Sequence, residues 1–282
     1  MIQVPAPEFS LRHTVECGQA FRWKPATADA YYGFIHGAAV KVRQDGDVLT
    51  IETADSRLTA TQVRDYFALD VDLRAILASI DTDAQIHDAI SRFYGLRVLR
   101  QDPWECLASF ICSSFNNIVR IQGMIGRLCQ SFGTPVAFNG FRGCSFPSAD
   151  VIARVPERRL RELGLGFRAP YLKATATLIA DGQLSLETLR RTDYWATRTA
   201  LLHCEGVGQK VADCVALFGF EKYEAFPVDV WIERAMRYYF RKRRMTTGRI
   251  QDFAHEHFGR YAGYAQQYLY HYVRTIRGKN AN

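Results

Sequence analysis

The chain has 282 residues, 48% of them hydrophobic, and this content excludes a disordered basic protein because it suffices for a packed core. The formal charge of +7 at pH 7 favours a polyanionic partner, although many unrelated proteins are equally basic. No apolar run approaches the roughly 18 residues of a membrane-spanning helix, so no membrane span is expected.

The first part of the chain has the pattern of a mixed α+β subdomain. Residues 1–98 alternate in hydrophobicity over several β-rich segments and then turn helical. Asp45-Gly46 is typical of a hairpin turn between two antiparallel strands. The predicted strands are Ala30–His36, Ala38–Arg43 and Val48–Glu52, and the predicted helices are Thr61–Phe67 and Asp83–Phe93.

From Pro103 onward the pattern is almost entirely helical, and residues 99–282 are expected to form a helical region. Asp102 predicts a helix N-cap that places Pro103 in the first turn. Breaks are predicted at Pro156, Gly164-Leu165-Gly166 and Asp181-Gly182, and later helices at Ala196–Cys204, Gln209–Phe218, Val230–Phe240 and Tyr261–Ile276. The predicted fold class is α+β, an N-terminal antiparallel sheet subdomain followed by mostly helical domains.

A helix-hairpin-helix is predicted at about 196–219, with the turn Gly206-Val207-Gly208 between its helices. Glycine lets a backbone come close to a partner, and a helix N-terminus attracts anions, so Gly206, Val207, Gly208 and Gln209 are expected to hold a DNA phosphate. Lys210 lies in the first turn of the second helix, where it is a candidate nucleophile. Spacing alone also allows a surface pair between Lys210 and Asp213.

Asp229 follows Lys210 by 19 residues and comes just after a Pro-Val turn. In this position an aspartate is a good helix N-cap, and a carboxylate held there can also stabilise positive charge. We expect Asp229 to do both.

Thiols and histidines give no pattern for a metal or a cofactor. The seven cysteines are scattered, no signal peptide precedes them, and an intracellular protein with reduced thiols is expected. No CxxC pair occurs and no cysteine follows Cys214, which excludes a closely spaced cysteine set for an iron–sulfur cluster. His255 and His257 lie on different faces of a predicted helix. No metal and no cofactor are expected, although a monovalent cation at the hairpin carbonyls stays open.

Several motifs occur in one order and together resemble the helix-hairpin-helix DNA glycosylases, and more narrowly the 8-oxoguanine DNA glycosylases. The resemblance covers residues 9 to 274, about the whole chain. Besides the hairpin, the lysine and the aspartate, the matching stretches are Cys17–Trp23, Arg100–Cys106, Phe110–Ser114 and Leu163–Arg168.

The resemblance implies roles around the damaged base. Lys210 would attack C1′ of the flipped nucleotide and Asp229 would stabilise positive charge on the sugar. The carbonyl of Gly18 would accept a hydrogen bond from N7–H, which 8-oxoguanine has and guanine lacks. A further set of residues would contact the base itself: Cys214 and Tyr270 on its two planes, and Gln266 at its Watson–Crick edge. Taken alone, Gly18 could be an ordinary turn glycine and Cys214 or Tyr270 a core residue.

The resemblance also implies contacts with the duplex around the vacated site. Arg120 and Arg168 would hold the orphaned cytosine, and Phe167 would act as a wedge. Phe115 stands beside Asn116 where animal enzymes have an asparagine that fills the emptied stack. Without the family, both arginines would be solvated charges and Phe167 a core residue. Two other sites are ambiguous: Trp231 stands where a phosphate-contacting histidine is common, and Arg241–Arg244 could be a solvated loop, a phosphate contact or a nuclear-import signal.

The expected function is therefore that of a bifunctional glycosylase and lyase. It would excise 8-oxoguanine from double-stranded DNA through a lysine Schiff base and β-elimination. It would act as a monomer inside the cell, associated with DNA in a nucleoid or a nucleus. Two alternatives remain: a glycosylase of the same superfamily for another damaged purine, and a non-catalytic DNA-binding module.

Overall fold

An antiparallel sheet organises the N-terminal part of the computed structural model, which describes residues 1–240 and 245–277. Its five strands run in the order β1-β5-β4-β3-β2. The three predicted strands are confirmed as β3 (Ala30–Ile35), β4 (Ala38–Asp45) and β5 (Val48–Thr53). Asp45 pairs with Val48 across the predicted turn, where Gly46 has a φ of 54°. The edge strands β1 (Ile2–Pro5) and β2 (Lys24–Pro25) are short and end in proline, and the sequence did not predict them.

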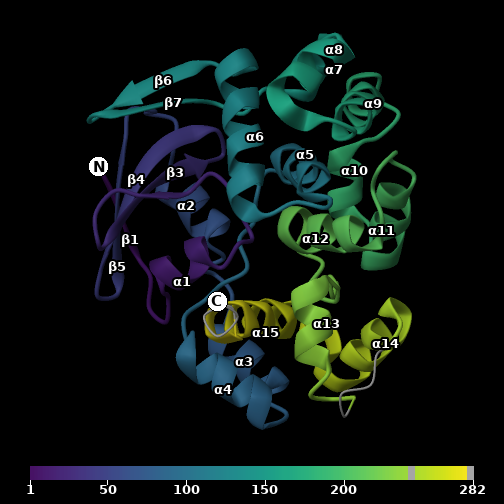
Figure 1. The fold of residues 1–282 in the computed structure, drawn as a ribbon. Helices are drawn as coiled ribbons and strands as arrows, with labels where there is room; N and C mark the ends of the chain where they lie inside the picture. The colour runs from purple at the N-terminus through teal and green to yellow at the C-terminus, as the bar shows by residue number, and fades with distance from the viewer. Residues whose placement is uncertain (241–244, 278–282) are drawn as a thin grey trace.

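The helical region is built around α5 (Pro103–Ser113), a helix buried along nearly its whole length. Asp102 caps it by accepting a hydrogen bond from the Glu105 amide, as predicted. It packs against α12 (Gln209–Phe220), and Figure 1 shows α5 and α12 among the upper helices. The other elements of this group are α6 (Ile118–Phe132), α7 (Ala149–Arg154), α8 (Glu157–Leu160), η1 (Arg161–Leu165), α9 (Arg168–Ala180), α10 (Leu186–Arg191) and α11 (Tyr194–Leu202).

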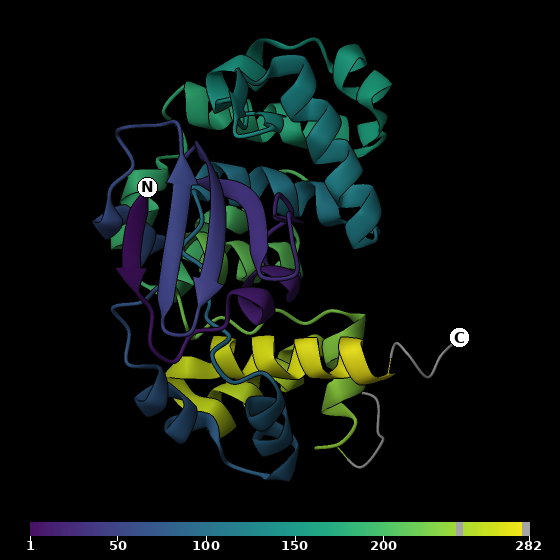
Figure 2. The same ribbon diagram turned by 90° about the vertical axis from the view of Figure 1, so that its left-hand side faces the viewer.

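A second group of helices lies below the first in Figure 1. It joins two helices from the N-terminal part to the last helices of the chain, and Figure 2 shows them side by side around α15. Its elements are α3 (Leu73–Ile80), α4 (Ala84–Arg92), α13 (Val230–Met236), α14 (Thr247–Phe258), η2 (Gly259–Tyr261) and α15 (Ala262–Arg277). None of the helices in residues 1–240 and 245–277 is long and apolar enough to cross a bilayer.

Two hydrophobic cores underlie these layers. One lies on the sheet with α1 (Leu11–Glu16) and α2 (Ala60–Tyr66), and it includes Leu99. The other fills the helical region and also takes the buried side chains of residues 73–98. The packing therefore crosses the domain boundary expected at residue 98, because α4 uses its apolar face to cover α15.

A short two-stranded sheet, which the sequence did not predict, interrupts a region that is otherwise helical as expected after Pro103. Strands β6 (Pro135–Phe138) and β7 (Phe141–Cys144) pair antiparallel. Asn139 and Gly140 form the turn with φ values of 45° and 80°. Both values are positive, as a type I′ hairpin turn requires. The predicted breaks do separate helices, since Pro156 precedes α8, Gly164 has a φ of 86° and Asp181 ends α9.

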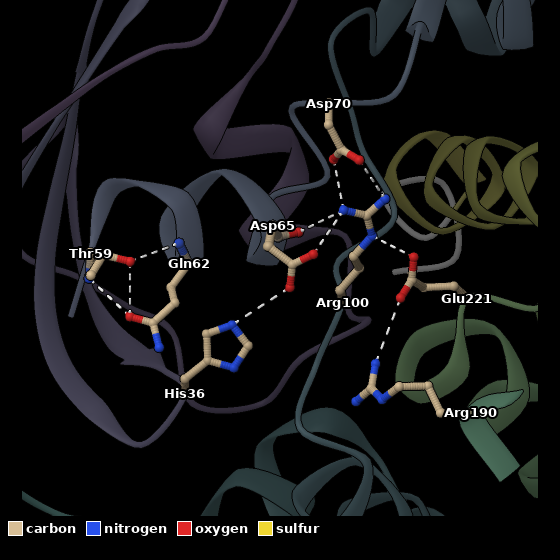
Figure 3. Close-up of polar contacts among 8 residues, drawn as sticks. All are labelled: His36, Thr59, Gln62, Asp65, Asp70, Arg100, Arg190 and Glu221. Atoms are coloured by element: carbon tan, nitrogen blue, oxygen red, sulfur yellow. Dashed lines mark hydrogen bonds and ion pairs between the residues drawn. The ribbon is translucent and has the colours of Figure 1, made fainter. Parts of the chain in front are cut away.

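Arg100 ties the sheet side to the far end of α12, and Figure 3 shows it surrounded by carboxylates. Its guanidinium contacts Asp70 at 2.7 Å and Asp65 at 3.0 Å. Its Nε lies 2.6 Å from Glu221, which ends α12 in the left-handed region. Glu221 also pairs with Arg190 of α10 at 3.7 Å. The cluster therefore fixes the C-terminal end of the helix whose N-terminal turn carries Lys210.

Candidate active site

The predicted hairpin is present between α11 and α12. Gly206 has a φ of 76°, and a Cβ built there would overlap the Tyr171 ring. Only glycine therefore fits this position without displacing a neighbour. Gly208 is the N-cap of α12 and has no side chain to cap its amides, and it is exposed together with Gln209. The first N–H groups of α12 are thus available to an anion.

The carboxylate of Asp213 is occupied by partners other than Lys210. It is fully buried and accepts hydrogen bonds from Arg198 Nε at 2.7 Å, Tyr194 Oη at 2.9 Å and Gln251 Nε2 at 2.6 Å. Burial raises its pKa, and the charge of Arg198 acts in the opposite direction. The alternative surface pair with Lys210 is therefore not formed, and Asp213 instead joins α11, α12 and α14.

The Lys210 side chain points toward the end of α5. Its Nζ donates to Ser113 Oγ at 3.3 Å and lies 4.9 Å from the centre of the Phe110 ring. The Ser113 hydroxyl in turn donates to the Phe110 carbonyl at 2.6 Å. Neither Ser113 nor Phe110 was singled out from the sequence, although both lie in the stretch Phe110–Ser114 that resembles the family.

Asp229 is the N-cap of α13, as predicted. Its carboxylate accepts hydrogen bonds from the N–H groups of Trp231 at 3.0 Å and Ile232 at 2.9 Å. Burial raises the pKa of this carboxyl group, while the amide bonds and the positive charge of Lys210 act against the increase. The positive charge of Lys210 thus acts to lower the pKa of Asp229, which indicates that the two side chains belong to one site.

Cys214 and Tyr270 complete the same site from two helices. Burial raises the pKa of the Cys214 thiol to about 12, and the positive charge of Lys210 opposes this increase. Burial likewise raises the pKa of Tyr270 to about 12, with Arg274 lowering it and Asp229 raising it further. Lys210 and Cys214 come from α12 and Tyr270 from α15, so the site lies between the two groups of helices.

Gly18 lies beside this site. Its φ is 91°, a conformation that favours glycine, and a Cβ there would be 3.4 Å from Tyr270 Cε1 and 3.2 Å from Arg274 Nη1. Gln266 is buried on the same helix as Tyr270 and donates from Nε2 to the Pro227 carbonyl at 3.2 Å. Its Oε1 atom has no partner in the part of the chain that the structure describes. A buried acceptor without a donor is costly, so it is suited to a ligand that brings one.

Two aromatic side chains protrude near the N-terminal ends of α6 and α9. Phe115 is 97% exposed and has a φ of 50°, and Phe167 is 46% exposed. Their ring centres lie 6.4 Å apart. The alternative of Phe167 as a core residue is therefore wrong. Asn116 is half-buried and donates to the Cys112 carbonyl at 3.3 Å, whereas Arg120 is exposed.

Arg168 is not the solvated surface charge that its sequence context alone would allow. It is buried, and its guanidinium donates to the carbonyls of Ser114 at 3.0 Å, Phe115 at 3.3 Å and Leu165 at 3.5 Å. Arg168 therefore fixes the backbone that presents Phe115.

The basic stretch Arg241–Arg244 lies outside the described residues. Within the described residues, no group of three or more His, Cys, Asp and Glu side chains is suited to hold a metal ion.

A helix-hairpin-helix that places a lysine and an aspartate beside an aromatic side chain defines a base-excision glycosylase of the helix-hairpin-helix class. Residues 108–257 match the family described as "HhH-GPD superfamily base excision DNA repair protein". Residues 1–107 match "8-oxoguanine DNA glycosylase, N-terminal domain". The chain belongs to the 8-oxoguanine DNA glycosylase family.

Relatives agree with this assignment over nearly the whole chain. The "N-glycosylase/DNA lyase OGG1" of Arabidopsis thaliana is 33% identical over 93% of this chain and 77% of its own length. The "Probable N-glycosylase/DNA lyase" of Methanothermobacter thermautotrophicus is 30% identical over 97% of this chain and 96% of its own. An 8-oxoguanine glycosylase/lyase of Clostridium acetobutylicum, solved with double-stranded DNA containing cytosine opposite 8-oxoguanine, superposes with a TM-score of 0.92. It is 32% identical, and the match covers 98% of this chain and 99% of that one.

Proposed function

We propose that this protein excises 8-oxoguanine from double-stranded DNA and then cleaves the strand at the resulting abasic site, as a bifunctional glycosylase and lyase of base excision repair. One feature supports this most: Lys210, whose Nζ donates to Ser113 at the end of α5, also acts through its charge on both Cys214 and Asp229, at a site that Tyr270 borders from α15. A nucleophile, an anion and an aromatic face are what glycosidic-bond cleavage on a flipped nucleotide needs.

The reaction begins when the neutral amine of Lys210 forms a bond to C1′ of the flipped nucleotide. The glycosidic bond breaks, its electron pair leaves with the base, and a proton passes from the newly bonded Lys210 nitrogen to the base. Positive charge that develops on the sugar is stabilised by the carboxylate of Asp229. The amine adduct opens to a Schiff base, a proton leaves C2′, and the 3′ phosphate departs by β-elimination. Ser113, which accepts a hydrogen bond from Lys210, orients the amine before attack.

Base recognition falls to Gly18, Cys214, Gln266 and Tyr270. The Gly18 carbonyl accepts a hydrogen bond from N7–H of the lesion, whereas guanine presents an acceptor at N7 and is repelled. Such a difference is worth on the order of 2–4 kcal/mol, or roughly 30- to 1,000-fold. Cys214 and Tyr270 contact the two planes of the base. The free Oε1 of Gln266 accepts from a donor on its Watson–Crick edge.

The hairpin and the two protruding rings hold the duplex. The N–H groups at Gly206, Val207, Gly208 and Gln209 bind a phosphate. Phe115 and Phe167 enter the base stack, and the backbone under Phe115 is held by Arg168 and flanked by Asn116. Arg120 is exposed and can reach the orphaned cytosine directly, while Arg168 contributes mainly through the loop that it fixes. The protein acts as a monomer, inside the cell and on DNA.

Borohydride trapping on a duplex with 8-oxoguanine opposite cytosine tests the chemistry. The wild-type protein should give a covalent adduct, and Lys210→Gln should give none. Lys173→Gln is a matched control, because Lys173 is also a half-buried lysine but donates to the carbonyls of Ala153 and Val155, away from the site. It should still be trapped.

The same assay decides between the alternatives. A non-catalytic DNA-binding module would give no adduct with any duplex. An enzyme for another damaged purine would be trapped on a formamidopyrimidine duplex and not on the 8-oxoguanine duplex.

A further inference from the structure

The backbone carbonyl groups around Gly18 differ in whether they accept a hydrogen bond. Of the four consecutive carbonyls of residues 16 to 19, three accept a hydrogen bond from a distant side chain. The donors are Arg274 Nη2 to Glu16 O at 2.6 Å, Gln267 Nε2 to Cys17 O at 3.3 Å and Gln101 Nε2 to Gln19 O at 2.7 Å. Across residues 1–240 and 245–277 no donor reaches the Gly18 carbonyl. The carbonyl that stays free is the one on which base recognition depends.

The Gln19 side chain anchors the same stretch from the other direction. It is only 1% exposed. Its Nε2 donates to the carbonyls of Thr14 and Arg97, each at 2.9 Å, and its Oε1 accepts from the Leu99 amide at 2.8 Å. All three bonds are buried, and each fixes backbone outside the loop. The peptides on both sides of Gly18 therefore have little freedom to rotate.

Gln267 links this loop to the helix that contacts the base. It lies next to Gln266 on α15 and three residues before Tyr270. Its side chain is buried, with 2% of its surface exposed. The hydrogen bond from Gln267 to Cys17 therefore sets the position of the Gly18 carbonyl relative to the two α15 side chains that contact the base.

We propose that Gln267 and Gln101 are positioning residues that, with Gln19, aim the Gly18 carbonyl at N7 of the flipped base; this rests on the proposed function. A mobile carbonyl could still bond the lesion, because it would be drawn to the N7–H group. Rejecting guanine is more demanding, because a mobile carbonyl would turn away and relieve the repulsion. Fixing the neighbouring peptides prevents that rotation, so the network makes discrimination possible.

Gln267→Met tests this inference, because methionine has a similar length and cannot donate. The first measurement is the ratio of affinities for duplexes that contain 8-oxoguanine or guanine, in a Lys210→Gln background where no base is removed. The ratio should fall about 2- to 10-fold, the value of one hydrogen bond. The second measurement is cleavage of a duplex with a preformed abasic site by Gln267→Met alone. It should stay unchanged, since no base is read.

Gln101→Met repeats the test at the other end of the loop and should lower the ratio by a similar factor. Gln44→Met is the matched control, since Gln44 also donates to carbonyls, those of Phe9 and Gly46, but not to this loop. In the Lys210→Gln background, Gln44→Met should leave the ratio of affinities for 8-oxoguanine and guanine equal to that of Lys210→Gln alone. An unchanged ratio in both test variants would overturn the inference, and so would an equal loss of abasic-site cleavage, which would indicate a structural role. The proposed substrate has its own test. It would be refuted if the wild-type protein cleaved abasic sites but showed no preference for 8-oxoguanine over guanine.

Discussion

Replacing Asp229 by asparagine should separate its charge from its role as a helix cap. The carboxylate accepts two backbone hydrogen bonds, at 3.0 Å from Trp231 and 2.9 Å from Ile232. Asparagine keeps an oxygen for both donors and caps nearly as well as aspartate. It removes only the negative charge beside Lys210. Burial raises the pKa of this carboxyl group, so its ionised form is costly in the folded protein, and asparagine does not have this cost.

The expected result is a loss of rate without a loss of stability. Removing one preorganised charge at a developing cation slows excision by roughly 100- to 1,000-fold, or about 3–4 kcal/mol. The melting temperature of Asp229→Asn should equal or exceed that of the wild type. Asp229→Ala should be as slow but should also lose the cap, which costs about 0.5–2 kcal/mol. For a chain of this size that corresponds to a decrease of roughly 1–8 °C.

The pH dependence has a definite sign. The folded pKa of Asp229 is above its unfolded value of about 3.9, so the unfolded chain loses this proton first as pH rises. The wild type therefore loses stability from this group between the unfolded and the folded pKa. The advantage of Asp229→Asn grows across that window and is constant above it. Excision by the wild type should fall as pH decreases through the folded pKa, because the anion is lost.

Single-turnover excision with enzyme in excess, together with thermal unfolding at several pH values, measures both effects. An asparagine variant that is fully active but melts at a lower temperature would refute this account. Asp229 would then be a structural cap only.

Three further predictions concern the DNA-binding face. Gly206→Ala should lower the free energy of unfolding by about 2–5 kcal/mol, because it combines left-handed strain with overlap with the Tyr171 ring. Adding Tyr171→Ala should relieve only the overlap, so melting shifts of the two variants that simply add in the double variant would contradict this account. Phe115→Asn should sharpen the preference for cytosine opposite the lesion by about 5- to 150-fold, since asparagine can hydrogen-bond and tolerates the positive φ. Excision opposite each of the four bases tests this, and a wild type that already rejects the other three strictly would refute it. Duplex affinity should fall steeply with salt, with a log–log slope of about −0.9 per phosphate contacted, and a flat response would exclude phosphate-led binding.

Local patterns in the sequence were sufficient for the central strands and for the helices α12 and α15, whereas α6, α9 and α14 were expected only as part of a helical region. Strands β3 to β5 alternate in hydrophobicity around a recognisable turn, and the Asp102 cap was predicted correctly. The hairpin of β6 and β7 was missed although Asn139-Gly140 is a strong turn signal, because the flanking strands have only four residues each. The short helix α1 was missed for a similar reason, since six residues give too little periodicity.

The candidate site shows the same limit. The hairpin glycines and the capping aspartate act through local backbone geometry, so local patterns made them candidates. For Lys210, spacing alone favoured a surface pair with Asp213, and the family resemblance favoured the nucleophile. Arg168 was misjudged without the family because its partners, the carbonyls of Ser114 and Phe115, lie more than 50 residues away in the sequence. No pattern within one helix encodes such a contact. Ser113 was overlooked because its partner Lys210 is 97 residues away.

The bond between Gln267 and Cys17 has a consequence for the growing polypeptide. Its two residues are 250 positions apart, so one end emerges from the ribosome long before the other. At ordinary rates of synthesis the interval is roughly 10–50 seconds. Only in the last part of that time, while residues 230 to 267 are added over roughly 2–8 seconds, are Lys210 and Asp229 already made and the α15 side of the site not. The ability to tell a damaged base from a normal one is therefore acquired last, when α15 docks and brings its tyrosines into the core. On the proposed mechanism, a nascent chain has its candidate nucleophile before it has the side chains that would select the base.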